Sequence, residues 1–372
     1  MQRADSSPDA AEEDGLKAFH DRVGAVVCQQ YAPDETLTTV EHLLTDQWVT
    51  ANPYRPRRPG AVRGKHPETE SKSCPLCRYE TPSHVMVIDM NLQVRIPSET
   101  ASTCAARAHL EDQDPRKVET YLELVKGLAE FNQKDIQGPY LARVLPNLIP
   151  PLGRGTAFLV AFEPRYHGVP LDEVSRTAVN GMIRAWAFLE DYASRHGQLA
   201  IAFVNHGAAA GATLPCPHSQ VYLLNYVPRL YQRINQRNEP GRCAMCRMLE
   251  NETVDRWAYY KGPHWVAYAH PTGVGSVIVV PTTHVAELTH LSVEGQQELA
   301  DVLQRSIGAM KHIHGGAVPP HNLWVRSGKV VGHLHAELQP RTSTPAGYEL
   351  ATHDLISVTD PTVLKDEMQR FL

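Results

Sequence analysis

The chain has 372 residues, of which 42% are hydrophobic and 21% charged, and its formal net charge is −5. This balance excludes a mainly disordered chain, and the absence of a basic excess argues against broad nucleic-acid binding. No apolar run is long enough to cross a membrane, and the polar, acidic residues 1–14 lack the pattern of a signal peptide. We therefore expect a protein without a membrane span, located in the cytoplasm.

The first part of the chain predicts a disordered tail over 1–15 and an extended, proline- and arginine-rich stretch over 48–60. Further along, the apolar residues Val179, Met182, Ile183 and Trp186 recur at the spacing of one buried helix face. We predict helices over 18–31, 115–134 and 171–196, a turn over 147–154, and strands over 85–90, 156–162, 200–204 and 218–225.

The second part of the chain repeats the order of strand, strand, helix and two strands. Leu299, Val302, Leu303, Ile307 and Met310 fall on one face of its helix. The predicted helix runs from 292 to about 313, and the predicted strands cover 265–269, 275–280, 322–325 and 333–338.

Like motifs also recur in the same order in the two parts. Each part carries a C-x-x-C pair, then a P-x-x-H motif, then a Cys/His-rich motif. The spacing from His167 to Cys216 is 49 residues, and the spacing from His284 to His333 is also 49. Matched spacing of like motifs indicates an internal duplication, with its boundary near 226–240.

Cysteine and histidine are the residues that suggest metal binding. The chain has 7 cysteines and 19 histidines, and an odd cysteine count argues against a disulfide framework. A structural zinc ion takes four Cys or His ligands in a tetrahedron. Each part supplies one such set, which predicts two structural zinc ions: Cys74, Cys77, His167 and Cys216 in the first, and Cys243, Cys246, His284 and His333 in the second.

Two other readings of these residues stay open. The cysteines can be ordinary buried residues beside surface histidines, although the matching order of four ligands in both parts argues against coincidence. Redox use of the pairs is less favoured, because neither pair opens a helix in a thioredoxin-like β-α-β context.

A histidine follows the last ligand of each set by two residues: His218 after Cys216 and His335 after His333. In a strand, residues two apart point to the same face, so the ligand would hold His218 rigidly. A neutral imidazole can attack phosphorus and form a covalent intermediate, which allows ping-pong transfer. The alternative is a core histidine. For His335 we expect a position inherited from the duplication rather than a chemical role.

The residues around His218 suit a phosphate. Gly207 and Gly211 allow the backbone to approach a ligand closely. Backbone N–H groups and the hydroxyl of Thr213 can cradle a phosphate. Gln220, two residues beyond His218, can donate its amide to a phosphate oxygen.

These residues resemble a known family. The stretch V-N-H-G-A-A-A-G-A-T-L-P-C-P-H-S-Q at 204–220 is similar to the active-site segment of galactose-1-phosphate uridylyltransferases, members of the histidine-triad superfamily. W-V-x-x-x-P-x-R-x-x-R-P at 48–59 and A-G-Y-E at 346–349 resemble two further signatures of that family. The resemblance spans roughly 44–350.

The resemblance implies an α+β fold of two fused histidine-triad-like halves, each a mainly antiparallel sheet with flanking helices. It implies an N-terminal tail and helix over 1–40, a catalytic half over 41–230 and a second half over 231–372. It also implies a homodimer whose active site lies near the subunit contact.

The resemblance assigns roles to individual residues. His218 matches the nucleotidyl-accepting histidine, and Gln220 the glutamine that steadies the phosphoryl group. Thr213 stands where the family has a phosphate-contacting serine. Matches to sugar contacts are Asn205, Tyr348 and Glu349, matches near the nucleotide are Arg55 and Arg58, and matches to zinc ligands are Cys74, Cys77 and His167.

The chain departs from the family at several positions. Cys216 replaces a histidine of many members and still suits zinc as a thiolate. Asn91–Leu92 replaces the Asn–Asp pair that holds the ribose, and the lysine expected shortly before Gly347 is missing. Arg326 replaces an iron-binding histidine of some bacterial members, which favours a second zinc ion. These departures leave the base and the sugar undetermined.

The leading prediction is a nucleotidyltransferase that acts on a nucleoside diphosphate-sugar and a sugar 1-phosphate through a nucleotidyl-histidine, similar to UDP-glucose:hexose-1-phosphate uridylyltransferase. Phosphate or water as acceptor would instead make a phosphorylase or a hydrolase. A zinc-stabilised, non-catalytic nucleotide-binding protein is the alternative from another class.

Overall fold

The apolar runs predicted as strands join into one large sheet. The computed structural model describes residues 38–41, 48–51, 74, 76–77, 86–95, 140–147, 157–238, 241–250, 252–270, 275–352, 354, 356–357 and 359–372. The predicted tail at 1–15, the predicted helices at 18–31 and 115–134, and the residues Arg55 and Arg58 lie outside the described residues.

The sheet has eleven strands among the described residues, and all its neighbouring strands pair antiparallel. Their order is β4-β3-β5-β6-β8-β7-β12-β13-β11-β10-β9. A separate pair is formed by β1 (Thr38–Glu41) and β2 (Trp48–Ala51). The strands of the large sheet are β3 (Met86–Asp89), β4 (Val94–Arg95), β5 (Tyr140–Pro146), β6 (Ala157–Ala161), β7 (Leu199–His206), β8 (His218–Leu224), β9 (Ala258–Lys261), β10 (Trp265–Ala269), β11 (Val277–Pro281), β12 (His321–Arg326) and β13 (His335–Pro340).

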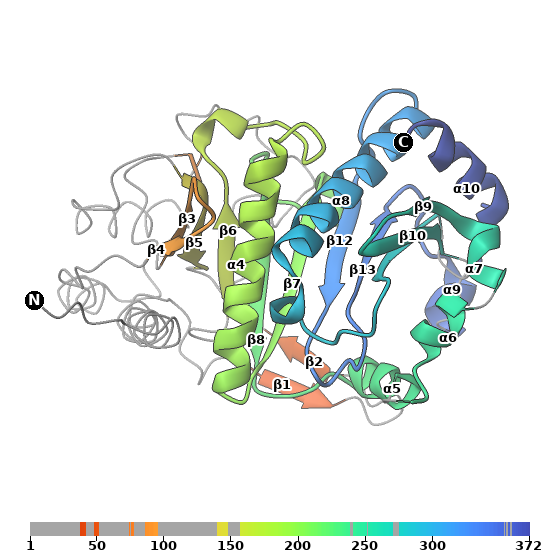
Figure 1. Ribbon diagram of the computed structural model, residues 1–372, viewed down its shortest axis with the longest axis horizontal. Coiled ribbons are helices and arrows are strands. Elements are labelled where there is room, and N and C mark those ends of the chain that lie inside the picture. The colour runs from red at the N-terminus through yellow and green to blue at the C-terminus, as the bar shows by residue number, and fades with distance from the viewer. Residues whose placement is uncertain are drawn as a thin grey trace, which may run out of the picture.

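The strand order repeats on the two sides of the β7–β12 contact. Reading outward from this contact gives β7, β8, β6, β5 and β3 on one side and β12, β13, β11, β10 and β9 on the other. A long helix precedes the innermost strand on each side (Figure 1). The topology thus has the repeat that the motifs predict, while its origin by duplication stays a prediction. Helix α5 (Arg229–Arg237) spans the predicted boundary between the halves.

Two long helices, α4 (Arg176–Arg195) and α8 (Val293–Ile313), cover one face of the sheet (Figure 1). Ser175 and Ser292 cap them, because each side chain accepts a hydrogen bond from the third residue that follows. The apolar faces of both helices join the strands in one large core that includes Trp186 and Leu303. The opposite sheet face presents His218, Gln220 and Tyr222 of β8, since alternate strand residues point the same way.

The remaining helices are short. They are α5, α6 (Ala244–Glu250), α7 (Glu252–Trp257), α9 (Gly347–Thr352) and α10 (Pro361–Arg370), together with 3-10 turns η5 (Pro164–Tyr166), η6 (Ala208–Ala210) and η7 (Leu288–His290). Among the described residues, no helix combines the length and apolarity of a membrane span.

The predicted fold class, a mainly antiparallel α+β fold with flanking helices, is confirmed. Three local predictions need correction. Helix α4 begins at Arg176 rather than at 171, because Ser175 provides its cap. The strand β5 was not predicted, since Arg143 and Pro146 interrupt its apolar pattern. Strand β8 begins at His218 as predicted, whereas β13 begins at His335 rather than at 333, so the ligands Cys216 and His333 both lie outside the strands.

Candidate functional site

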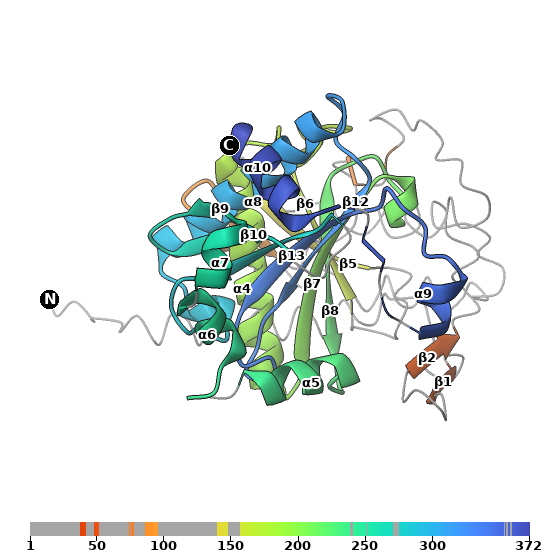
Figure 2. The same cartoon turned by 90° about the vertical axis from the view of Figure 1, so that its right-hand side faces the viewer.

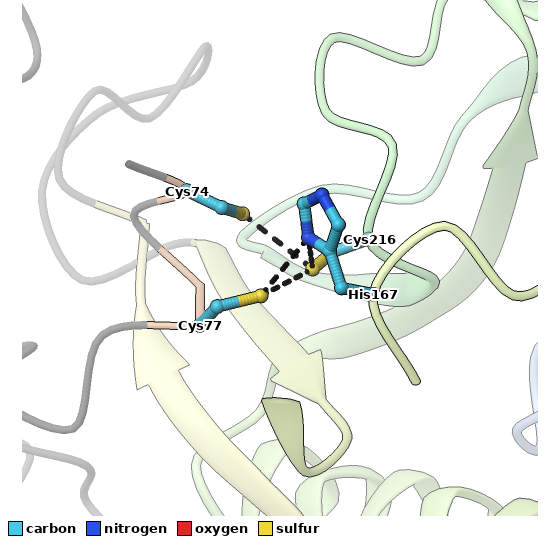
Figure 3. A group of neighbouring side chains, drawn as sticks. All are labelled: Cys74, Cys77, His167 and Cys216. Atoms are coloured by element: carbon cyan, nitrogen blue, oxygen red, sulfur yellow. Dashed lines mark hydrogen bonds between the residues drawn. The ribbon is translucent and has the colours of Figure 1, made fainter. Parts of the chain in front are cut away.

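The four predicted metal ligands of the first set converge from three separate segments of the chain (Figure 3). The Sγ atom of Cys77 lies 2.8 Å from Sγ of Cys216 and 3.1 Å from Nδ1 of His167. Sγ of Cys74 lies 3.5 Å from Sγ of Cys216. The four ligand atoms all lie within 4.8 Å of one another. The C-x-x-C pair thus meets the turn after β6 and the approach to β8.

The thiols of this cluster perturb each other's protonation. Hydrogen bonds from Cys216 and Cys77 lower the pKa of Cys74, and the same contact with Cys74 raises the pKa of Cys216. Buried Arg143 of β5 donates to the carbonyl oxygen of Leu76, which lies between the two cysteines of the pair. These contacts therefore favour the thiolate form at Cys74 and the thiol form at Cys216, and the neighbouring strand β5 holds the cysteine loop.

The second set converges in the same way. Nδ1 of His333 lies 3.1 Å from Sγ of Cys243 and 3.6 Å from Sγ of Cys246. Nδ1 of His284 lies 3.3 Å from Sγ of Cys246. Burial lowers the pKa of His333 to about 4, with a further contribution from His284. His333 is therefore a neutral imidazole at pH 7, the form that binds metal.

Both clusters have the chemistry and the size of a metal site. A tetrahedral zinc ion with bonds of about 2.0–2.3 Å would place its ligand atoms about 3.3–3.8 Å apart. The ligand atoms of each cluster lie within 4.8 Å of one another. Both clusters combine cysteine sulfur with imidazole; the first is mostly buried, and the second has two buried residues, Cys243 and His333. The two Cys/His clusters can therefore hold metal ions.

The second cysteine pair does open a helix, contrary to part of the sequence argument. Helix α6 begins at Ala244, and the N–H group of Cys246 donates to Sγ of Cys243 at 3.4 Å. The helix that precedes α6 is α5, so the β-α-β context of a thioredoxin-like redox pair is absent from this described part of the chain. The redox alternative stays disfavoured for this reason.

His218 is the first residue of β8 and is 7% exposed. Its Nδ1 lies 2.8 Å from the backbone oxygen of Cys216. A carbonyl oxygen only accepts, so Nδ1 carries the proton and Nε2 carries the lone pair. Next to it, Trp186 of α4 donates through Nε1 to Oγ of Ser219 at 2.8 Å, which fixes β8 against the helix layer.

Gln220 lies two residues beyond His218 on the same strand face. The hydroxyl of Tyr222 donates to Oε1 of Gln220 at 3.1 Å. This contact engages the amide oxygen and leaves Nε2 of Gln220 as a donor for a ligand. Phe203 of β7 packs edge-on against Tyr222, with ring centroids 4.9 Å apart.

The loop after β7 has the tight geometry that its glycines predict. Gly207 has φ +79° and Gly211 has φ +81°, both in the left-handed region. A Cβ atom at Gly207 would lie 3.0 Å from Cβ of Pro320, so the close approach also requires glycine. Thr213 follows this loop on the way to β8, and a cavity of about 250 Å³ borders Asn205 and Gly207.

His335 of β13 is the counterpart of His218 in the second part. Its Nδ1 lies 2.9 Å from the backbone oxygen of His333, so the same tautomer is imposed. Here, however, Nη1 of Arg326 donates to Nε2 at 3.4 Å, and Arg326 also pairs with Glu337. The nitrogen that would attack phosphorus is therefore engaged within the protein.

Several residues that the sequence predicts to contact the substrate do not lie beside His218. Asn91 lies in the turn between β3 and β4, where its N–H group donates to Oδ1 of Asp89 at 2.8 Å. Tyr348 and Glu349 lie on α9, which projects away from the sheet (Figure 2). Tyr348 is 54% exposed. Asn205, Gly207 and Gly211, in contrast, lie on β7 and on the loop that leads back towards β8.

Comparisons with known proteins identify relatives of this chain. No family model matches the chain. Galactose-1-phosphate uridylyltransferase of Thermotoga maritima is 28% identical over 277 residues, which cover 70% of this chain and 71% of that protein. The chain is similar to galactose-1-phosphate uridylyltransferases. The resemblance inferred from the motifs is confirmed.

Two further matches extend the comparison over nearly the whole chain. ADP-glucose phosphorylase of Arabidopsis thaliana is 22% identical over 347 residues, which cover 86% of this chain and 88% of that protein. The solved structure of a uridylyltransferase has a TM-score of 0.62 at 20% identity and covers 89% of this chain and 97% of that one. The chain therefore shares its fold with a solved uridylyltransferase.

Sequence reasoning missed Tyr222, Asn322 and Arg143, which contact predicted site residues or the cysteine loop. The signal for Asn322 and Arg143 was a polar residue within an otherwise apolar strand pattern. Tyr222 continues the i, i+2 series of His218 and Gln220 and was detectable from that spacing.

Proposed function

We propose that this protein is a nucleotidyltransferase that acts on a nucleoside diphosphate-sugar and a sugar 1-phosphate by ping-pong transfer through His218. The observation that carries the proposal is the hydrogen bond from Nδ1 of His218 to the backbone oxygen of Cys216, which sets the lone pair of the ring on Nε2. Homology to galactose-1-phosphate uridylyltransferases supports the choice of reaction and of substrates.

In the first half-reaction, Nε2 of His218 attacks the α-phosphorus of the nucleoside diphosphate-sugar. An N–P bond forms, the bond from the α-phosphorus to the bridging oxygen breaks, and sugar 1-phosphate leaves with the bond electrons. In the second half-reaction, a phosphate oxygen of an incoming sugar 1-phosphate attacks the same phosphorus. The N–P bond breaks, and the new nucleoside diphosphate-sugar is released with the histidine restored.

The remaining site residues have supporting roles in this proposal. Nε2 of Gln220 donates to a non-bridging oxygen of the phosphoryl group, and preorganised donors of this kind stabilise developing negative charge. Thr213 and the backbone of the loop between Gly207 and Gly211 contact phosphate. Asn205 contacts the sugar phosphate, and Arg55 and Arg58 offset the charge of the nucleotide.

Both metal clusters hold structural zinc ions in this proposal, one per cluster. When bound, zinc would tie distant loops together without taking part in the transfer. The ligands would be Cys74, Cys77, His167 and Cys216 in the first site, and Cys243, Cys246, His284 and His333 in the second. The four-ligand sets leave no position for substrate, as expected of structural sites.

We further propose that two chains form a homodimer, with Tyr348 and Glu349 contributing near the subunit contact. The exposure of Tyr348 and the projection of α9 support this arrangement. The catalytic half would cover 41–230 and the second half 231–372, following a tail and helix over 1–40. Asn91 would lie near the ribose, at the position of the altered Asn–Asp pair.

The test is intact mass spectrometry after incubation with UDP-glucose or ADP-glucose in the absence of acceptor. Denaturation is kept brief and near neutral pH, because phosphoramidates are acid-labile. A mass gain of one nucleoside monophosphate is expected, and its size identifies the base. The gain is expected to disappear in His218→Ala and to persist in His335→Gln, the matched change in the second part.

The acceptor is then found by adding galactose 1-phosphate, orthophosphate or buffer alone to the labelled protein. Rapid loss of label with the sugar phosphate supports the proposed transferase. Rapid loss only with orthophosphate would make it a phosphorylase, and rapid loss in buffer a hydrolase. Absence of label with both donors, together with absence of nucleotide binding, would contradict the proposed reaction for these donors.

A further inference from the structure

Asn322 connects the two parts of the sheet at the loop beside His218. It lies on β12 directly opposite Asn205 of β7 in the strand register. Its Nδ2 donates to Oδ1 of Asn205 at 2.8 Å and to the backbone oxygen of Ala210 at 2.9 Å. One side chain of the second part thus holds both a predicted ligand contact and the glycine-rich loop of the first.

These two hydrogen bonds fix the orientation of both amides. The backbone oxygen of Ala210 only accepts, so the atom of Asn322 that faces it must be the amide nitrogen. That nitrogen only donates, so the atom of Asn205 that faces it must be the amide oxygen. Asn205 is therefore left with its Nδ2 group, a donor, for a ligand.

The loop between Gly207 and Gly211 also packs against the residues that precede Asn322. Pro320, two residues before Asn322, lies so close to Gly207 that a Cβ atom there would be 3.0 Å from Cβ of the proline. Within the loop, Ala210 and Ala212 both donate their N–H groups to the backbone oxygen of Gly207 at 3.1 Å. The loop is thus a compact unit, and Asn322 attaches it to β12 through Ala210.

We propose that Asn322 is a positioning residue of the nucleotidyl-transfer site, which sets the polarity of Asn205 so that its Nδ2 donates to an acceptor oxygen of the bound sugar phosphate. This inference rests on the proposed function. Gln220 has the matching polarity, because Tyr222 engages its Oε1. Two amide donors then flank His218, an arrangement suited to the oxygens of a phosphorylated ligand and unsuited to a cation.

Asn322→Asp tests the polarity with little change of shape. The introduced carboxylate would face two acceptor oxygens, so Asn205 is expected to turn its Nδ2 towards that carboxylate and its oxygen towards the ligand. The ligand would then lose the Nδ2 donor of Asn205 and face its amide oxygen. This change is expected to lower kcat/KM for the preferred nucleotide-sugar by about 10- to 100-fold. Asn225→Asp is the matched control, because Asn225 is exposed and follows the opposite end of β8.

A double-mutant cycle separates positioning from a general structural effect. If Asn322 acts through Asn205, Asn322→Asp lowers kcat/KM by less than about threefold in an Asn205→Ala background. An equal loss in both backgrounds, or activity equal to that of Asn225→Asp, overturns the inference. If Asn322→Asp fails to fold, Asn205→Asp carries the test, since Asn322 still donates to one oxygen while the other faces the ligand.

A binding measurement keeps this inference distinct from the proposed function. If the wild-type chain forms no nucleotidyl-histidine, the proposed reaction fails, and calorimetric titration with ADP and UDP decides the role of Asn322. If Asn322→Asp binds the nucleotide at least about tenfold more weakly than the wild type, the amide orientation that Asn322 sets still contributes to ligand binding. Equal affinities, or no binding of either nucleotide, would overturn it.

Discussion

Nδ1 of His218 lies 2.8 Å from the backbone oxygen of Cys216, a residue whose Sγ also belongs to the first Cys/His cluster. The cluster and the proposed nucleophile are therefore linked through one residue. Whatever holds the thiol of Cys216 also holds the carbonyl that sets the tautomer of His218. The sequence predicts that Cys216 holds His218 because both lie on one strand face. In the structure the backbone oxygen of Cys216 holds His218 instead.

The first prediction concerns this link. Cys216→Ala is expected to lose one of two zinc ions per chain and to slow nucleotidylation of His218 at least about tenfold, because the carbonyl is no longer held. Cys216→His is expected to retain both ions, since imidazole also ligates zinc. The measurements are metal content by mass spectrometry and the rate of adduct formation.

Cys243→Ala is the control, because it removes a ligand of the other cluster. It is expected to lose one zinc ion and to retain most of the nucleotidylation rate. Equal slowing by Cys216→Ala and Cys243→Ala would show that metal loss acts through general destabilisation and not through the His218 contact.

Motif spacing gave both ligand sets, and the hydrophobic patterns gave most of the strands around them. The equal 49-residue spacings nevertheless conceal different loops. The segment between helix and strand is 196–198 in the first part and the longer 314–320 in the second, while the next loop is 207–217 in the first and the shorter 327–334 in the second. Together with the different lengths of the helices and strands, these differences cancel in the spacing and cannot be read from it.

The side-chain contacts that orient the site could not be predicted from the sequence either. Asn322 and Asn205 are far apart in the chain, and only the antiparallel pairing of β7 with β12 places them opposite each other. Similarly, Arg326 reaches His335 because β12 and β13 pair in one particular register. The alternation of residues along a strand has a period of two, so it predicts which face a side chain joins but not which residue lies opposite it.

The second prediction concerns Tyr222, whose hydroxyl donates to Oε1 of Gln220 at 3.1 Å. Tyr222→Phe keeps the packing against Phe203 and removes the hydrogen bond, which frees the amide of Gln220 to rotate. The single-turnover rate of nucleotidylation is expected to fall about 5- to 20-fold, equivalent to about 1–2 kcal/mol. Rapid-quench kinetics and thermal unfolding are the measurements.

The control tests whether the effect of Tyr222→Phe on the rate depends on Gln220. In a Gln220→Ala background, Tyr222→Phe is expected to change the rate by less than about twofold, because the contact is already gone. A loss of the same size in both backgrounds would indicate that Tyr222 acts directly or through the fold.

The third prediction concerns His335, whose Nε2 is engaged by Arg326. His335→Gln is expected to keep a stoichiometry of one nucleotidyl group per chain and a rate within about threefold of the wild type. It is expected to lower the free energy of unfolding by about 1–3 kcal/mol, because Arg326 and the backbone oxygen of His333 lose a buried partner. Intact mass spectra and urea unfolding measure the two effects. Loss of the adduct with the fold intact would assign His335 a chemical role.

The last prediction concerns His321, a buried histidine at the β7–β12 contact. Its side chain is 1% exposed and stacks on His206, and its Nδ1 lies 2.9 Å from the backbone oxygen of Pro319. Burial lowers the pKa of His321 to about 4. The neighbouring His206 also has a lowered pKa because of burial, while Asp172 raises it.

The direction of the pH effect follows from these pKa values. In the unfolded chain His321 takes up a proton below about pH 6.5, whereas in the folded chain it does so only near pH 4. Between these values the unfolded chain binds more protons, so the folded state loses stability as the pH falls. The loss approaches about 3 kcal/mol near pH 4. His321→Gln is expected to make the fall of the unfolding free energy with decreasing pH less steep, by about 1.2 kcal/mol per pH unit between pH 6 and 4.5. Urea unfolding of both proteins at a series of pH values measures the difference, and effects of metal release common to both proteins cancel. Identical slopes would show that His321 is protonated in the folded chain.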